Sequence, residues 1–320
     1  MLNRKVIISI FLSVLCGVLF IISAYTKLFP TEPLEISLVD IGFSWKLAPY
    51  LARTLIGAEF AFGFLFIFLF KLKRVTVPAS IVLLVAFTIY LLLLLKQYGN
   101  RGSCGCFGET IPMTPIEGIM KNVVLIGMLA VLYFISPAFD FRFKKIIAAF
   151  GALILLALPF VLNPTGSPFK PRTLESYQKQ KIDLDALYKG DDSTGIPPSV
   201  ELRKGKHVIA FLSMRCSHCR IAAKKLCVIK KEHPDVPLFF VLAGKKERLR
   251  EFFDDTKCDS IPYMHLKNDQ EFLKFTGGIF PQIFWINNSV IEFDCNYFEL
   301  NDADIEKWLV IKDTILPVRK

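Results

Sequence analysis

The sequence is poor in charged side chains. Only 21% of its 320 residues are Asp, Glu, Lys or Arg, whereas 53% are hydrophobic, and the mean hydropathy is +0.44. These values exclude an ordinary soluble globular protein. The chain also has no internal repeat and no second cysteine pair at the spacing of a zinc site. We therefore expect neither a repeat protein nor a metal centre.

The net charge of +10 does not indicate nucleic-acid binding, because of where the charges lie. Residues 1–167 hold 14 Lys and Arg against 7 Asp and Glu, whereas residues 168–320 hold 25 against 22. Most of the positive excess therefore lies beside apolar segments, where it sets membrane orientation. We expect a lipid bilayer, and no nucleic acid, as the partner of this half.

Five stretches are apolar and long enough to cross a bilayer, which takes about 20 helical residues. They cover approximately 6–25, 48–70, 75–95, 119–139 and 146–163. The first is not a cleavable signal peptide, because its apolar run is too long and no small-x-small site follows it. Cys16 within it is expected to be a buried helix residue. The pattern predicts an all-α transmembrane helical bundle over residues 1–164.

Basic residues mark one side of this bundle. They precede the first span and fill the second and fourth loops: Arg4, Lys5, Lys71, Lys73, Arg74, Arg142, Lys144 and Lys145. The positive-inside rule then predicts a cytoplasmic N-terminus in an inner (cytoplasmic) membrane. Five crossings would leave both the third loop and the chain after residue 164 on the periplasmic, extracytoplasmic side.

The second half has the pattern of an α/β domain. A Pro-, Gly- and Ser-rich segment at 163–168 ends the membrane half, residues 165–200 are expected to form a linker or connector, and a domain is expected over 201–320. The expected strands are 208–212, 238–242, 282–286 and 290–293, with a hairpin turn at Asn287-Asn288. The expected helices are one ending near 231 and others at 246–255, 270–275 and 302–309.

Two motifs carry a resemblance in this half. Cys216-Ser217-His218-Cys219 directly follows a strand, and Phe280-Pro281 directly precedes the late strand and hairpin. With them, the second half resembles the thioredoxin superfamily nearly from end to end, which implies a thioredoxin-like domain. In that family the proline is cis and faces the dithiol, and Pro281 matches it better than Pro262 does. Met214-Arg215 replaces the usual aromatic residue before the first cysteine, which bears on substrate fit.

The position of Cys216 predicts its chemistry. A cysteine at a helix N-terminus meets unpaired backbone N–H groups that stabilise its thiolate. Cys216 would be the nucleophile, and Cys219, one turn later, would resolve the mixed disulfide. A stabilised thiolate makes the disulfide more oxidising. A static disulfide and half of a zinc site are the alternatives. Nearby positive charge is expected from His218, Arg215, Arg220 and Lys224.

The membrane half carries a second cysteine motif, Ser103-Cys104-Gly105-Cys106-Phe107-Gly108, in its third loop. Lys121-Asn122 follows in the next span, and Arg53 and Gly57-Ala58-Glu59 lie in the second. With these motifs, residues 5–140 resemble the MauE branch of the MauE/DoxX family. The resemblance implies a bundle related to quinone-coupled disulfide-forming membrane proteins.

Two thiols separated by one glycine can close into a small, easily reduced ring, which makes Cys104 and Cys106 a second redox pair. Alternatively they are free thiols or partners of Cys227, Cys258 or Cys295. Cys227 is expected in the core, and Cys258 and Cys295 could pair with each other.

Glu59 within a span needs a partner, because a carboxylate in the bilayer is costly. Lys27 and Arg53 are the available cations. A structural ion pair and a proton-transfer role both remain open.

These features predict a membrane-bound thiol–disulfide oxidoreductase. It would pass electron pairs between thiols of extracytoplasmic client proteins, the C-x-x-C domain and the C-x-C loop. No cysteine pair lies in the cytoplasmic loops, which favours the oxidising direction. The resemblance implies a quinone as acceptor, with no covalently bound cofactor. The alternative is a membrane-anchored assembly factor or chaperone without an electron relay.

Overall fold

The computed structural model describes residues 4–101, 113–137, 142–165, 177–190, 195–300 and 302–311. The chain forms two compact units, Met1–Thr165 and Gly166–Lys320. Cys104 and Cys106 lie outside the described residues, and the structure therefore does not place them.

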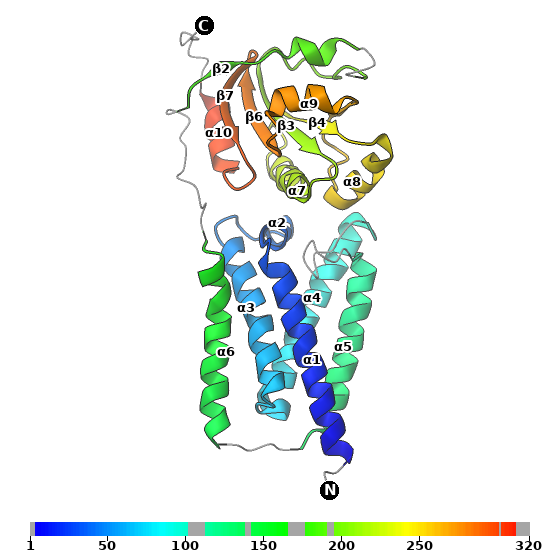
Figure 1. Cartoon of the computed structure of the whole chain (residues 1–320), viewed down its shortest axis with the longest axis vertical. Helices are drawn as coiled ribbons and strands as arrows, with labels where there is room; N and C mark the ends of the chain where they lie inside the picture. The colour runs from blue at the N-terminus through cyan, green and yellow to red at the C-terminus, as the bar shows by residue number, and fades with distance from the viewer. Residues whose placement is uncertain are drawn as a thin grey trace. The chain divides into compact units, whose positions relative to one another are not determined.

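The first unit is a bundle of long helices (Figure 1). Apolar and aromatic side chains on the outside of these helices are largely exposed, among them Phe134 at 78% and Val82 at 70%. Exposed residues of this kind fit contact with lipid chains, and the unit is a membrane domain. Its elements are α1 (Arg4–Leu28), α2 (Glu32–Asp40), α3 (Ala48–Ile67), η1 (Leu72–Thr76), α4 (Val77–Tyr98), α5 (Pro115–Ile135) and α6 (Arg142–Leu162).

Five spans of full length were expected, and the described residues contain four, although α6 also packs along α3. Within the described residues, Arg4–Leu28, Ala48–Ile67, Leu72–Tyr98 and Pro115–Ile135 are long and apolar enough to cross a membrane. The fifth expected span corresponds to α6, whose apolar part is the shorter stretch Ile146–Leu162. At 1.5 Å per residue, that stretch is about 25 Å long, against a hydrocarbon core of about 30 Å.

Small residues allow close packing of α3 between α1 and α6. A Cβ atom on Gly63 would lie 2.8 Å from the carbonyl oxygen of Gly17 on α1. A Cβ atom on Gly57 would overlap the carbonyl oxygen of Leu156 on α6. Gly151 of α6 similarly faces the ring of Phe64, and so α6 runs antiparallel to α3.

Hydrogen bonds near α2 show that the chain leaves the bundle at the same end after α4 and after α6. The Asn163 side chain, just after α6, donates to Thr31 Oγ1 at 3.0 Å, and Arg53 Nε donates to the Asn163 carbonyl at 2.5 Å. The Tyr98 hydroxyl, at the end of α4, donates to Asp40 at 2.7 Å. The loop after α4 and the chain after α6 therefore leave the bundle at the same end, beside α2.

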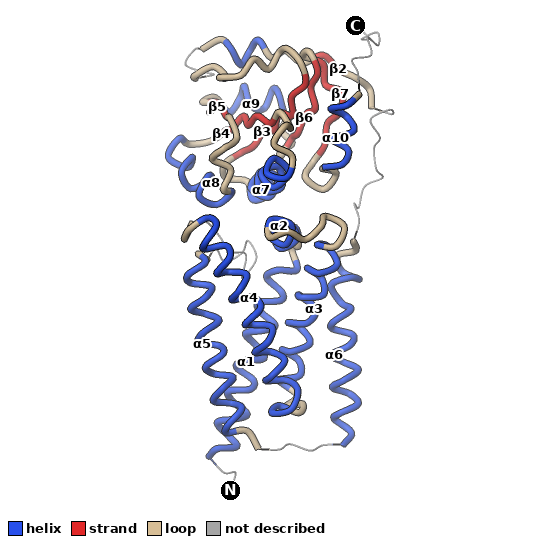
Figure 2. Tube along the Cα trace, turned by 180° about the vertical axis from the view of Figure 1, so that it is seen from behind, coloured by secondary structure: helices blue, strands red, loops and turns tan. Residues whose placement is uncertain are grey.

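The second unit is an α/β domain with one mixed sheet (Figure 2). The strand order is β2-β7-β6-β3-β4-β5, with β3, β4 and β5 parallel and β6 and β7 antiparallel. A parallel β3–α7–β4 unit, the β6–β7 hairpin and a closing helix α10 make up the expected thioredoxin-like arrangement. The elements are β2 (Gln180–Lys181), η3 (Asp185–Tyr188), β3 (Lys206–Ser213), α7 (Ser217–Glu232), β4 (Leu238–Ala243), η4 (Lys246–Arg248), α8 (Leu249–Thr256), β5 (Tyr263–Leu266), α9 (Asp269–Thr276), β6 (Gln282–Asn287), β7 (Val290–Cys295) and α10 (Asp302–Val310).

Side chains alternate between two covered faces of this sheet. Ile209 and Phe211 of β3 belong to a buried cluster that includes Leu187 of η3 and Phe272 of α9. On β6, Trp285 packs against Trp308 of α10, with ring centroids 5.6 Å apart. Both faces are buried, which explains why the central strands appear in the sequence as continuous apolar runs.

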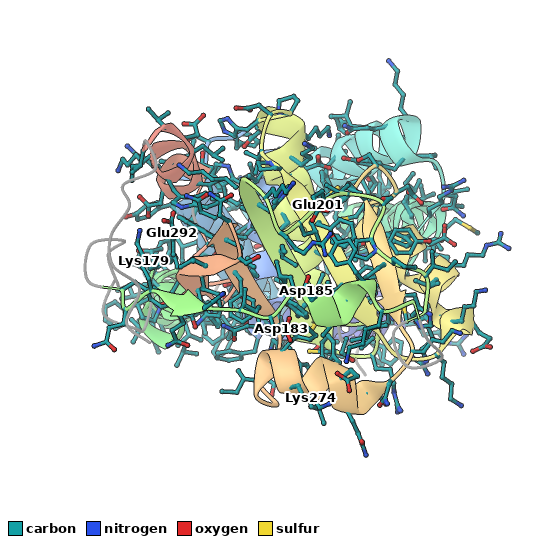
Figure 3. All side chains as sticks on the ribbon, turned by 90° about the horizontal axis from the view of Figure 1, so that it is seen from above. Lys179, Asp183, Asp185, Glu201, Lys274 and Glu292 are labelled. Carbon is teal, nitrogen blue, oxygen red and sulfur yellow. The ribbon has the colours of Figure 1, made fainter. Side chains whose placement is uncertain are left out.

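The structure also corrects the expected linker at 165–200. Leu184, Leu187 and Leu202 are fully or almost fully buried in the core, and Gln180–Lys181 pairs with β7 as an edge strand. Lys179 also donates to Glu292 of β7 at 2.7 Å, and both residues are labelled in Figure 3. Residues 177–190 and the described residues from 195 onward are therefore part of the domain. The sequence pattern missed it because short polar runs separate its buried leucines.

Two local features differ from the sequence expectation. The β6–β7 turn is formed by Asn288 and Ser289, one residue later than expected, and both have positive φ, as a type I′ turn requires. Strand β5 was not expected. It has four residues and is held by parallel pairing with β4, a non-local contact that a short sequence window does not reveal.

Burial of the segment before β3 predicts an effect on stability. We expect Leu187→Ala to lower the free energy of unfolding by about 2–5 kcal/mol, because it leaves a cavity in the core. Ile196→Ala, in the same segment at an 85% exposed position, should change it by less than about 0.5 kcal/mol. Urea unfolding followed by the fluorescence of Trp285 and Trp308 measures both variants. Equal stability of the two would restore the linker interpretation.

Candidate redox site

Cys216 caps the N-terminus of α7. It has extended backbone angles (φ −84°, ψ 122°) and lies between the end of β3 and the first turn of α7. Its Sγ accepts a hydrogen bond from the Cys219 backbone N–H at 3.4 Å. Strand β3 is the central buried strand, so the dithiol lies at the carboxyl end of the sheet on a rigid support. Both sulfurs are free thiols here.

The two cysteines differ sharply in acidity. The pKa of Cys216 is lowered to about 6, chiefly because the Cys219 thiol donates a hydrogen bond to its sulfur, with smaller help from the Cys219 backbone N–H and the charge of His218. Cys219 is fully buried, and burial together with its contact to Cys216 raises its pKa far above the ordinary value. At neutral pH Cys216 is therefore largely a thiolate, whereas Cys219 keeps its proton.

Two of the basic residues expected beside the dithiol, Arg220 and Lys224, are paired with acids on α8. Arg220 contacts Glu251 at 2.7 Å and Asp255 at 3.4 Å, and Lys224 contacts Asp255 at 3.2 Å. Arg220 also donates to the Met214 carbonyl, which fixes the segment before Cys216. These cations therefore hold α8 and the active turn together. The paired acids largely neutralise their charge, so that little of it acts on the Cys216 sulfur.

His218 lies on the exposed side of the same turn. Its ring stacks on Tyr297, with centroids 5.7 Å apart and planes inclined by 13°. Tyr297 follows β7 and is buried, so it anchors the imidazole beside the dithiol. No local sequence pattern indicates this contact, because about 80 residues separate the two rings.

Pro281 lies at the same end of the sheet as the dithiol. The Phe280–Pro281 peptide is cis, the isomer that the thioredoxin resemblance implies, whereas Ile261–Pro262 is not among the cis bonds of the described residues. Gln282 pairs with Phe211 in the β3–β6 ladder, so Pro281 stands one residue beyond this pair, towards the active turn. Its side chain is buried.

Comparison with known proteins defines the family. Residues 5–135 match the family described as methylamine utilisation protein MauE. The chain is 30% identical over 296 residues to Protein TlpB of Flavobacterium psychrophilum, a match that covers 78% of this chain and 80% of that protein. The chain belongs to the TlpB family.

One solved structure is weakly similar to this chain. It is the thioredoxin domain of thiol-disulfide oxidoreductase BVU-2223 from Bacteroides vulgatus, with 18% identity and a TM-score of 0.28 over 33% of this chain and 81% of that chain. At this score the likeness adds no weight, and the thioredoxin-like fold rests on the strand order and the position of Cys216.

Cys258 and Cys295 do not form the disulfide that the sequence left open, and both are free thiols. The buried Cys258 hydrogen-bonds with Cys227 of α7. Burial is the main cause, and this hydrogen bond the second, of a Cys258 pKa well above its ordinary value. Cys295 lies at the end of β7, also buried as a free thiol. Cys16 is buried in α1, as expected.

Glu59, the buried acid of the membrane unit, pairs with Lys27, one of its two expected partners. Lys27 Nζ donates to Glu59 Oε1 at 2.6 Å, and both side chains are 4% exposed. Arg53 instead pairs with Glu35 of α2 at 2.5 Å. Among the described residues, the bundle thus holds the buried Lys27–Glu59 pair and a separate, partly buried Arg53–Glu35 pair.

The contacts of Cys216 predict which neighbour controls its acidity. Cys219→Ala should raise the Cys216 pKa more than His218→Ala does, because the thiol hydrogen bond is the largest cause of the shift. Cys219→Ser, which keeps an O–H donor, should retain most of the shift. The pH dependence of Cys216 alkylation, followed by peptide mass spectrometry, gives each midpoint. A larger effect of His218→Ala would show that the imidazole, and not Cys219, controls the thiolate.

Proposed function

We propose that this protein is a membrane thiol–disulfide oxidoreductase that oxidises client proteins. The observation that carries the proposal is the cap of α7, where Cys216 is acidic and half-buried while Cys219 is fully buried and keeps its proton. This difference supports Cys216 as the sulfur that exchanges with partner proteins and Cys219 as the sulfur that resolves the mixed disulfide. A static disulfide would not need such a difference in acidity.

The exchange balances as two electrons and two protons. A client thiolate attacks Cys216 of the Cys216–Cys219 disulfide, and Cys219 leaves as a thiol after taking a proton. A second client thiol then releases Cys216, so that the client gains a disulfide and the domain becomes a dithiol. The Cys104–Cys106 disulfide would reoxidise the domain, and a quinone would take the electron pair and two protons to become a quinol.

The low pKa of Cys216 supports the oxidising direction. A stabilised thiolate favours the reduced dithiol, and the disulfide is therefore a stronger oxidant. The positions of the cysteines agree with this direction, because the loops on the N-terminal side of the bundle contain none. A cytoplasmic reductant would have no dithiol to reduce there.

The geometry around α2 supports a single extracytoplasmic relay. The loop after α4 and the chain after α6 leave the bundle at the same end, as the Tyr98–Asp40 and Asn163–Thr31 contacts indicate. Basic residues concentrate towards the opposite end, at Arg4, Lys5 and the η1 segment. We therefore assign the α2 end to the extracytoplasmic face of an inner membrane.

The proposed orientation predicts the outcome of labelling in intact cells. After reduction, a membrane-impermeant maleimide should modify Cys216, Cys104 and Cys106, whereas the buried Cys16 should react only after denaturation. A variant with a single cysteine added after Met1 is the control for the opposite face. Protection of Cys216 until the membrane is broken would contradict the assigned orientation.

The relay predicts the redox state of the soluble dithiol. Replacing Cys104 and Cys106 with Ala should leave Cys216 and Cys219 reduced in cells, because their oxidant is lost. Cys227→Ala with Cys295→Ala, a matched pair outside the relay, should leave them oxidised. Alkylation with a mass-shifting maleimide reads both states. A dithiol that stays oxidised without the loop cysteines would favour the assembly-factor interpretation.

A further inference from the structure

The membrane unit contains a cavity that no part of the thiol chemistry uses. It has a volume of about 220 Å³ and lies among α1, α3, α4 and α5, with Leu34 of α2 also lining it. Its location is therefore towards the end of the bundle where α2 lies. A dry apolar cavity of about 150 Å³ is known to hold benzene, so this one has room for a substituted six-membered ring.

The cavity walls are apolar over most of their area. They are formed by Leu19 and Phe20 of α1, Leu84 and Phe87 of α4, and Leu125 and Met128 of α5. Phe20 and Leu84 are almost completely buried. Such walls favour a flat, lipophilic ring.

A buried polar cluster lies at one side of the cavity. Lys27 Nζ donates to Glu59 Oε1 at 2.6 Å and to Ser23 Oγ at 2.9 Å, and Ser23 in turn donates to Glu59 Oε1 at 3.2 Å. All three residues line the cavity. Every one of these bonds to the carboxylate uses the same oxygen, Oε1.

The second oxygen of Glu59 is left without a donor. Oε2 is buried and has no hydrogen-bond partner within the part of the chain that the structure describes. Glu59 itself is only 3% exposed. A buried carboxylate oxygen requires a donor, so the site selects a ligand that carries an O–H or N–H group on an apolar ring.

We propose that this cavity binds the head group of a lipophilic quinol, whose hydroxyl donates to Glu59 Oε2. This inference rests on the proposed function for the identity of the ring, since that function requires a lipophilic two-electron acceptor. Lys121 and Asn122 also line the cavity and can donate to an oxygen of either form of the ring. The oxidised quinone has no donor of its own, and so it leaves Oε2 without a partner. The geometry therefore favours the reduced ligand over the oxidised one.

This preference has a direct thermodynamic meaning for the proposed relay. A site that binds the quinol more tightly than the quinone shifts the bound couple towards the quinol by the ratio of the two affinities. The same ratio makes the bound quinone a better electron acceptor. The Lys27–Glu59 pair thus assists reduction by binding the product, without contact to either dithiol.

The test compares two oxidation states of one probe in the full chain. Cys104 and Cys106 are replaced by Ser, so that no thiol relay operates, and the protein is placed in lipid nanodiscs. We expect ubiquinol-1 to bind at least tenfold more tightly than ubiquinone-1, measured anaerobically by equilibrium dialysis. Glu59→Gln, whose amide N–H₂ can donate to a carbonyl, should abolish or reverse the preference. Equal affinity for both forms in the parent protein would overturn the proposal.

Two further variants separate the site from the rest of the bundle. Glu35→Gln makes the same chemical change in the partly buried Arg53–Glu35 pair and should keep the tenfold preference. Leu19→Trp keeps the Lys27–Glu59 pair, fills the cavity and should weaken both ligands at least tenfold, so it tests the site even if Glu59→Gln does not fold. Binding unchanged in Leu19→Trp would show that the probe sits elsewhere in protein or lipid. Because the loop cysteines are absent from every variant, this binding test does not depend on electron transfer. A missing quinol preference would therefore count against the site and not against the proposed relay.

Discussion

The cap of α7 is the interaction on which the chemistry of this molecule depends. The Cys219 N–H and thiol both point to the Cys216 sulfur, and the Ser213 backbone N–H in turn donates to the Cys219 sulfur at 3.3 Å. A chain of donors thus runs from the end of β3 to the exposed sulfur. Because β3 is central and both of its faces are covered, the donors are held in place before a client arrives. The remainder of the domain maintains this arrangement.

The sequence predicted the parts of the fold that local patterns encode. The four central strands, the C-x-x-C turn at a helix start and the membrane bundle all follow from apolar runs and cysteine spacing. For Glu59 the sequence left Lys27 and Arg53 open as partners, and the structure shows Lys27. What was missed depends on contacts between distant residues. Strand β5 exists through β4, and Leu184 and Leu187 are buried because η3 closes one face of the sheet.

The sequence predicted which residues form the candidate site better than it predicted the charge around them. Cys216 and Cys219 lie as their spacing indicated, but Arg220 and Lys224 are paired with α8 acids that the sequence places some 30 residues away. The contribution of His218 is correspondingly smaller than that of the Cys219 thiol. Charge counted along a sequence overstates the field at a sulfur, because neighbouring helices supply counter-ions that only the fold brings close.

The unequal exposure of the two sulfurs also determines which of them an oxidant can damage. Peroxide reacts with thiolates, so Cys216 is the sulfur open to sulfenic acid formation, while the protonated and buried Cys219 is protected. A sulfenic acid on Cys216 would lie beside a thiol able to condense with it, with loss of water, to the ordinary disulfide. The same burial that makes Cys219 a slow nucleophile thus keeps it available to rescue its neighbour before irreversible oxidation.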